Sequence, residues 1–156
     1  MSVISGEVAH FFQNQGYVVV STLGRKGHIH NSCKGIVEIK TSGEVYLLDL
    51  YRNHTLSNLK KNPHISLTAV DEHKFKGYCL QGKAKIVRMG DIPSGIMRSW
   101  EDRLASRISQ RLIKNIRGER GHLRHPEALL PRPKYLIVAG IEKVVDLTPE
   151  HLKEGV

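Results

Sequence analysis

The chain has 156 residues, of which 40% are hydrophobic and 25% are charged, proportions that are ordinary for a soluble globular protein. No apolar run approaches the roughly 20 residues of a membrane span, and the N-terminus does not resemble a secretory signal. Cys33 and Cys79 are too few for a disulfide framework and match no metal-ligand spacing. We therefore expect a cytoplasmic protein without a metal site, and its net charge of +9 indicates an acidic partner.

The first part of the chain predicts a helix followed by short strands. Ile4, Val8, Phe11 and Phe12 share one helical face, which predicts a helix over about residues 4–15 with both phenylalanines in the core. β-branched and aromatic residues then predict a run of strands. Their expected ranges are 17–23, 28–34, 36–40 and 44–50, with turns at 24–27 and 41–43. We expect these strands to form an antiparallel meander.

A short helix interrupts the strands after residue 50. Thr55 is the predicted N-cap, and Asn62-Pro63 is the predicted end. Further strands are predicted over residues 64–70 and 77–88, and Gly82 within the second indicates a bulge or a close approach of a ligand to the backbone.

The hydrophobic period changes to four residues after Asp91, which is the predicted cap of a long amphipathic helix. Arg103, Arg107 and Arg111 form a separate basic stripe on this helix. Residues 118–133 are expected to be a loop, residues 135–145 a last strand, and residues 149–153 a terminal turn. Together the elements predict about six antiparallel strands that close into a small barrel with peripheral helices.

Two polar clusters carry the functional signal. The second cluster, residues 52–58, offers cationic groups, hydroxyls and a helix start, which are the groups that hold phosphates. The alternative is that Thr55 is only an N-cap and Asn58 only closes the turn. The first cluster, residues 30–34, lies on a strand whose side chains alternate, so that Asn31 and Cys33 point opposite to Ser32 and Lys34. Its alternative is a half-exposed edge strand.

The order and spacing of three segments carry a resemblance to a known family. They read VVVSTLGRKGHIHNSCKG, VYLLDLYRNHTLSNLKKNPHISL and GYCLQGKAKI, and residues 50–62 are the most specific part. Over about residues 3–88 the chain resembles the FMN-binding split-barrel flavoproteins of the pyridoxamine-phosphate-oxidase-like group. The resemblance implies a mainly β, six-stranded antiparallel split β-barrel of Greek-key type with peripheral helices. It also implies a homodimer with FMN near the subunit interface.

The same resemblance implies which residues hold FMN. The first cluster would contact the flavin ring and ribityl chain, the second would grip the phosphate, and Gln81 would approach the ring. The expected cofactor-binding residues are Asn31, Ser32, Cys33, Lys34, Arg52, Asn53, His54, Thr55, Asn58 and Gln81. No catalytic acid or base is identified, because His28, His30 and His54 are candidates only through their position near the expected pocket.

The implied function is that of an FMN-dependent oxidoreductase acting on an unidentified small substrate. Three features depart from the family pattern. His54 stands where Lys or Arg is frequent, so phosphate affinity is expected to depend on pH. The chain lacks the Arg-Leu-x-Pro ending of authentic pyridoxamine-phosphate oxidases, which places that reaction in doubt. Within a single domain of residues 1–156, the arginine-rich segment 89–133 is expected to be an insertion that covers the flavin or joins the dimer.

Two other classes of function remain open at this level. Related split barrels bind haem or a deazaflavin, and His122 and His125 are candidate haem ligands. A basic β-barrel is also typical of nucleic-acid-binding modules, although aromatic stacking residues are scarce here. No hydrolase, nucleotide-binding or metalloprotease motif is present.

Overall fold

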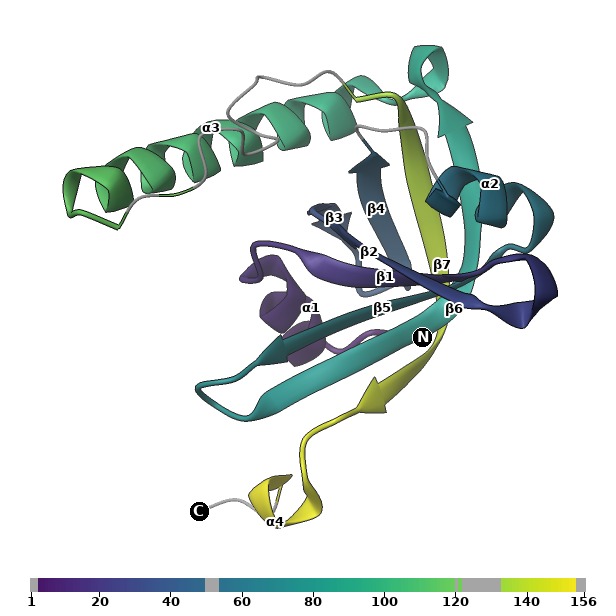
Figure 1. Cartoon of the computed structure of the whole chain (residues 1–156), viewed down its shortest axis with the longest axis horizontal. Helices are drawn as coiled ribbons and strands as arrows, with labels where there is room; N and C mark the ends of the chain where they lie inside the picture. Colours follow the sequence, from purple (N-terminus) through teal and green to yellow (C-terminus); the bar gives the residue numbers. More distant parts are fainter. Residues whose placement is uncertain (1–2, 50–53, 120, 122–132, 154–156) are drawn as a thin grey trace.

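The structure is a computed structural model that describes residues 3–49, 54–119, 121 and 133–153. Its strands form one antiparallel seven-stranded sheet in the order β2-β1-β5-β6-β7-β4-β3. The strand bounds are β1 Val18–Leu23, β2 Ile29–Lys34, β3 Ile36–Ile39, β4 Glu44–Asp49, β5 His64–Asp71, β6 Lys76–Arg88 and β7 Tyr135–Asp146. The sheet curls into a half-barrel with helices around it (Figure 1), which confirms the predicted mainly β split-barrel architecture.

The strand count and one expected pairing were wrong. The sheet has seven strands where six were expected, and β2 and β3 lie at its two opposite edges. Only Gly35 separates these strands, and a single residue is too short for the two-residue turn that a tight hairpin needs. The chain therefore forms two separate hairpins, β1–β2 and β3–β4, and crosses the open side of the barrel between them.

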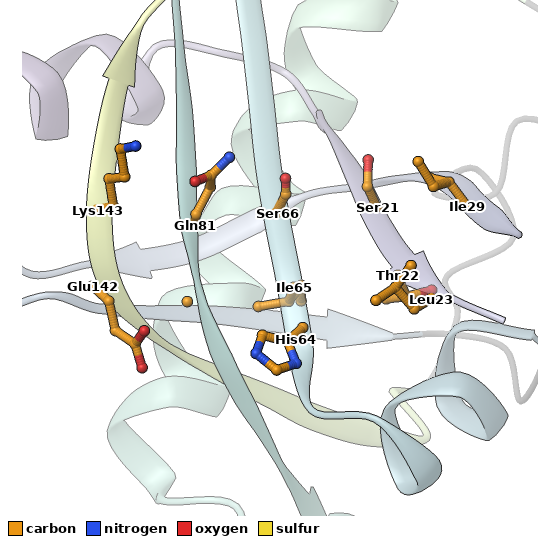
Figure 2. Close-up of a pocket in the computed structure, with 11 residues that line it drawn as sticks. Ser21, Thr22, Leu23, Ile29, His64, Ile65, Ser66, Gln81, Glu142 and Lys143 are labelled. Carbon is orange, nitrogen blue, oxygen red and sulfur yellow. The ribbon is translucent and has the colours of Figure 1, made fainter. Parts of the chain in front are cut away.

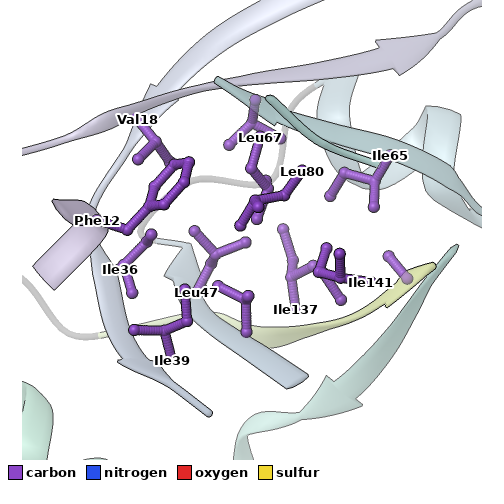
Figure 3. Packing of buried hydrophobic residues seen from close by; sticks show 14 of the residues in the cluster. Phe12, Val18, Ile36, Ile39, Leu47, Ile65, Leu67, Leu80, Ile137 and Ile141 are labelled. Atoms are coloured by element: carbon purple, nitrogen blue, oxygen red, sulfur yellow. The ribbon is translucent and has the colours of Figure 1, made fainter. Parts of the chain in front are cut away.

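The inner face of the sheet encloses the main core. Alternate residues of each strand point inward, and α1 (Gly6–Gln13) closes one end of the core with Phe12, which lies next to Val18 and Ile36 (Figure 3). The side chain of Ser5 caps this helix by accepting a hydrogen bond from the backbone N–H of Val8 at 3.2 Å. The predicted helix over residues 4–15 is thus confirmed with shorter bounds. Phe12 lies in the core as expected, and Phe11 is partly buried and packs against it.

The long helix α3 (Ser94–Ile116) covers the outer face of the β3-β4-β7 half of the sheet. Its side chains Ile96 and Trp100 pack in a second apolar cluster with Val37 and Leu136, and its far end extends beyond the barrel (Figure 1). Within the part of the chain that the structure describes, no helix is long and apolar enough to cross a bilayer.

Two expectations for this helix were wrong. The helix begins after Pro93, because Asp91 belongs to a short 3-10 turn (η2, Met89–Asp91) and a residue preceding proline disfavours the α conformation. The arginines are also not separate from the packed face, since Arg103 and Arg107 are half-buried. The guanidinium of Arg107 lies against Gly35. Burial, followed by the nearby charge of Arg107, lowers the pKa of Arg103.

Gly82 marks a bulge between β6 and β7, as predicted. Gln81 lies opposite Lys143 while Gly82 lies opposite Ile141, so Glu142 is an extra residue in β7. A β-carbon at Gly82 would lie 1.9 Å from the carbonyl oxygen of Gly140, which explains why glycine stands there. Because of the bulge, the consecutive residues Glu142 and Lys143 are both exposed on the same outer face.

Candidate functional site

The outer face of five strands carries a line of polar side chains that we call the polar row. In the pairing register, each of its residues lies opposite the next one on the neighbouring strand. The polar row consists of Asn31, Ser21, Ser66, Gln81 and Lys143. Figure 2 shows four of these side chains across the sheet, and the hydroxyl of Ser21 donates to Asn31 Oδ1 at 2.6 Å. Alternation of side chains along each strand thus assembles hydrogen-bonding groups from five segments.

A cavity of about 420 Å³ lies over part of the polar row, and we call it the outer pocket. Leu23 and Ile29 supply apolar wall, whereas His64, Gln81 and Glu142 supply polar groups (Figure 2). Such a combination of apolar walls with a few hydrogen-bonding groups is typical of small-molecule and cofactor sites.

His64 in the outer pocket is held in one orientation by Asn62. The side-chain oxygen of Asn62 accepts the backbone N–H of His64 at 3.1 Å and lies 2.7 Å from His64 Nδ1. Because an amide oxygen can only accept, Nδ1 carries the ring proton and Nε2 keeps its lone pair in the neutral ring. The sequence analysis did not identify His64, Glu142 or Lys143 as site residues, since their approach depends on strand register and on the bulge.

A second cavity of about 470 Å³ adjoins the first, and we call it the basic pocket. It lies between the turn that contains the 3-10 helix η1 (Arg25–Gly27), strand β2 and helix α2 (His54–Lys61). Its lining residues are Gly24, Arg25, His28, Ile29, His30, His54, Ser57, Asn58 and Lys61. No described residue of this lining carries a carboxylate. Ile29 lines both pockets, so the basic pocket and the outer pocket meet there.

Contacts between β2 and α2 bring the two predicted polar clusters together. The hydroxyls of Ser32 and Thr55 hydrogen-bond at 3.0 Å, and the rings of His30 and His54 lie 5.3 Å apart between centroids. Thr55 does not serve as the N-cap, because α2 already includes His54 and the Thr55 side chain is fully buried against the sheet. The side-chain amide of Asn58 donates to Thr22 Oγ1 at 3.1 Å, which fixes the same helix to β1.

The expected cofactor-binding residues thus fall into groups with different surroundings. Asn31 and Cys33 lie on the same face, as alternation predicted, and Gln81 shares this outer face. His54 lines the basic pocket. Ser32 and Thr55 are joined at the junction of β2 and α2. Arg52 and Asn53, as well as the candidate haem ligands His122 and His125, lie outside the described residues.

Lys34 is a charged residue of the expected site that lies buried in the structure. Its ammonium forms a buried ion pair with Asp49 at 2.6 Å, so β2 is not simply a half-exposed edge strand. The hydroxyl of Tyr135 donates to the same carboxylate. Burial, and then the hydrogen bond to Asp49, raises the pKa of Tyr135 above its ordinary range. Because Lys34 ends one edge strand and Asp49 lies beside the other edge, this group ties the two sides of the split together.

Solved structures with the same fold are similar to nearly the whole chain. HupZ of Group A Streptococcus is 18% identical with a TM-score of 0.63, and the match covers 93% of this chain and 94% of that one. A Clostridium acetobutylicum protein of the pyridoxinephosphate oxidase family is 16% identical with a TM-score of 0.57, with 94% of each chain covered. An F420 reductase is 14% identical with a TM-score of 0.54, with 83% and 88% covered.

No curated protein matches the chain significantly by sequence. The family model described as pyridoxamine 5'-phosphate oxidase, however, matches residues 4–129, which run from before α1 to beyond α3. That match spans most of the chain and agrees with the split-barrel fold. The chain belongs to the pyridoxamine 5'-phosphate oxidase family.

Proposed function

We propose that the protein binds FMN, with the phosphate in the basic pocket and the flavin ring over the polar row, and acts as an oxidoreductase on a small substrate. The observation that carries this proposal is the meeting of the two pockets at Ile29. One pocket offers positive charge, and the other offers apolar wall with hydrogen-bonding groups. Membership of a family that generally binds flavins supports the same assignment.

The donor set of the two pockets fits the two ends of FMN. A phosphate monoester carries up to two negative charges, and Arg25, Lys61 and the histidines of the basic pocket supply cationic or N–H donors. A flavin ring has flat apolar faces and polar edge atoms, and Asn31, Ser21 and Gln81 present hydrogen-bonding groups in one line. Bound FMN would supply the redox chemistry, while these residues orient it.

The first test is whether the protein retains FMN and what the hydroxyl of Thr55 contributes to retention. Thr55→Val keeps the side-chain volume but leaves the Ser32 hydroxyl without its partner in a part-buried contact, at a cost of about 1–2 kcal/mol. We expect FMN affinity to fall roughly tenfold, because α2 carries His54 and Lys61 into the basic pocket. Fluorescence titration of the flavin measures the change.

Ser109→Ala is the matched control for this variant, because the Ser109 hydroxyl donates within α3, to the carbonyl of Ala105 at 3.0 Å, and does not line the basic pocket. If Thr55→Val and Ser109→Ala bind FMN with equal affinity, helix α2 does not contribute to binding of the FMN phosphate. Similarity to an F420 reductase makes a deazaflavin the second candidate cofactor. Absorption spectra and mass spectrometry of the released cofactor distinguish the two.

The proposal includes a homodimer in which the partner covers the outer face beside the flavin. Helix α3 covers only the β3-β4-β7 half of the sheet, and the other half exposes Ile29 and Val70 at 70% and 59%. Members of this family are often dimeric, and apolar exposure beside an open pocket fits a self-association surface.

Val70→Glu is therefore expected to shift the protein toward monomer, because the partner would bury an unpaired carboxylate there. Leu152→Glu, in the short helix α4 (Glu150–Lys153) and 47% exposed, is the control that should leave association unchanged. Sedimentation velocity measures both variants. A dimer that withstands Val70→Glu as well as it withstands Leu152→Glu would exclude this part of the sheet as the interface.

A further inference from the structure

Among the described residues, His30 holds a buried polar atom that has no hydrogen-bond partner. Its Nε2 is inaccessible to solvent and is not paired with any described residue, although His30 lines the basic pocket. Buried polar atoms in folded proteins are nearly always paired, and an exception calls for a ligand, a water molecule or a catalytic role. Because His30 lines a pocket rich in positive charge, an anion is the kind of ligand that suits its imidazole.

A second histidine stands beside the first from a different element. The ring of His54 on α2 lies 5.3 Å from the ring of His30 on β2, with 51° between the ring planes. Two imidazoles at this distance repel each other when both are protonated, unless an anion lies between or beside them. Protonation of the pair and binding of an anion should therefore favour each other.

The other charged groups of the pocket do not supply that anion. Arg25 and His28 reach it from the turn before β2, and Lys61 reaches it from α2. All of these carry or can acquire positive charge, and Ser57 and Asn58 are neutral. Among the described residues of the lining there is no carboxylate to neutralise the histidines. A bound anionic ligand would supply the compensating negative charge that the described lining lacks.

We propose that His30 and His54 form a proton-dependent phosphate clamp, which holds the flavin phosphate when the histidines are protonated and releases it as they lose their protons. The inference rests on the proposed FMN function and adds His30 as a residue that determines specificity for the phosphorylated flavin. It also assigns a regulation to the site, in which proton concentration controls cofactor retention. Arg25 and Lys61 line the same pocket and supply a basal affinity that does not depend on the two histidines.

The direction of the pH effect follows from two ionisations. Histidine changes charge between about pH 5 and pH 8, and a phosphate monoester loses its second proton near pH 6. Above the second ionisation of the phosphate, a rise in pH removes charge from the histidines and none from the phosphate, so affinity for the phosphorylated flavin should fall.

The test compares FMN with riboflavin, which lacks the phosphate, on the full-length apoprotein at about pH 6.5 and about pH 8.5 and constant ionic strength. Fluorescence titration should show FMN affinity falling about tenfold or more at the higher pH, and riboflavin affinity changing less than about twofold.

Three variants test the roles of the individual histidines. His54→Lys, which keeps a permanent charge, should reduce the pH dependence of FMN affinity. His30→Gln should weaken FMN binding mainly at the lower pH, and His73→Gln, outside the pocket lining, should behave like the unaltered protein.

Each contrary outcome has a distinct meaning. Equal FMN affinity at the two pH values would overturn the clamp and leave the FMN function standing. A fall that riboflavin shares would also overturn it, because the effect would then not come from the phosphate. Failure to bind either flavin at either pH would overturn the proposed function together with the clamp. The comparison within the unaltered protein is independent of whether any variant folds.

Discussion

Replacing Gly82 by alanine is expected to cost about 3 kcal/mol or more of folding free energy, because the new methyl group has no space. Its carbon would lie 1.9 Å from the carbonyl oxygen and 2.8 Å from the carbonyl carbon of Gly140. Both atoms belong to the backbone of β7, so relief requires the two central strands to separate locally. Urea denaturation followed by circular dichroism measures the loss.

The functional consequence of Gly82→Ala follows from the same geometry. The bulge at this position directs Glu142 and Lys143 into the outer pocket, so a shift of β7 against β6 should disturb the pocket as well as the fold. We expect any variant that still folds to lose flavin affinity.

Gly35→Ala is a matched control, because the three atoms nearest to its methyl group would all belong to the guanidinium of Arg107, the closest at 2.7 Å. That guanidinium is the end of a flexible side chain and can move, so the expected loss is below about 1 kcal/mol. Gly95→Ala meets no atom within 4 Å and should not destabilise the protein. Equal losses of folding free energy from Gly82→Ala and Gly35→Ala would show that β7 can shift away from β6 at little cost. The close backbone approach at the bulge would then not constrain residue 82.

Replacing Asp49 by alanine is expected to cost about 3–5 kcal/mol, because it leaves the ammonium of Lys34 buried without its counter-charge. The exposed fractions of the two side chains in this ion pair are only 5% and 4%. The hydroxyl of Tyr135 would lose its acceptor in the same step. Thermal and urea denaturation at neutral pH should both show the loss.

Two controls separate the burial of charge from the loss of packing. The combined substitution Lys34→Met, Asp49→Leu and Tyr135→Phe removes the buried charges and the hydroxyl together and should recover much of the stability. Glu44→Gln removes one partner of the exposed Lys40–Glu44 pair, whose atoms lie 3.9 Å apart, and should cost less than about 1 kcal/mol. A loss from Asp49→Ala as small as that from Glu44→Gln would contradict the structure.

The ion pair also bears on the proposed site. Lys34 ends the edge strand that carries Asn31 to the polar row and Ser32 to helix α2. Loss of Asp49 should therefore loosen β2 at the open side of the barrel and lower flavin affinity even at temperatures where the protein is folded. This dependence explains how a buried structural pair can influence cofactor binding without contacting the cofactor.

The sequence by itself determined most of the elements and the direction of many side chains. Hydrophobic residues recur at every second position in strands and at about every fourth position in the long helix, and this pattern depends only on neighbours along the chain. The bounds of these elements could therefore be predicted to within a few residues. Alternation likewise placed Asn31 and Cys33 on the face opposite to Ser32 and Lys34. The association of the first cluster with Thr55, which came from the family resemblance, is consistent with the hydrogen bond between Ser32 and Thr55.

Only the tertiary structure decided which distant segments meet. The placement of β2 and β3 at opposite edges, the buried partner of Lys34 and the polar row all depend on strand register, which is a property of pairs of segments. The bulge that turns Glu142 toward the outer pocket lies where the backbone of Gly140 in β7 approaches Gly82 in β6 too closely for a β-carbon. His30 was visible in the sequence, but its unpaired nitrogen was not, because burial of a single atom results from the packing of several elements around it.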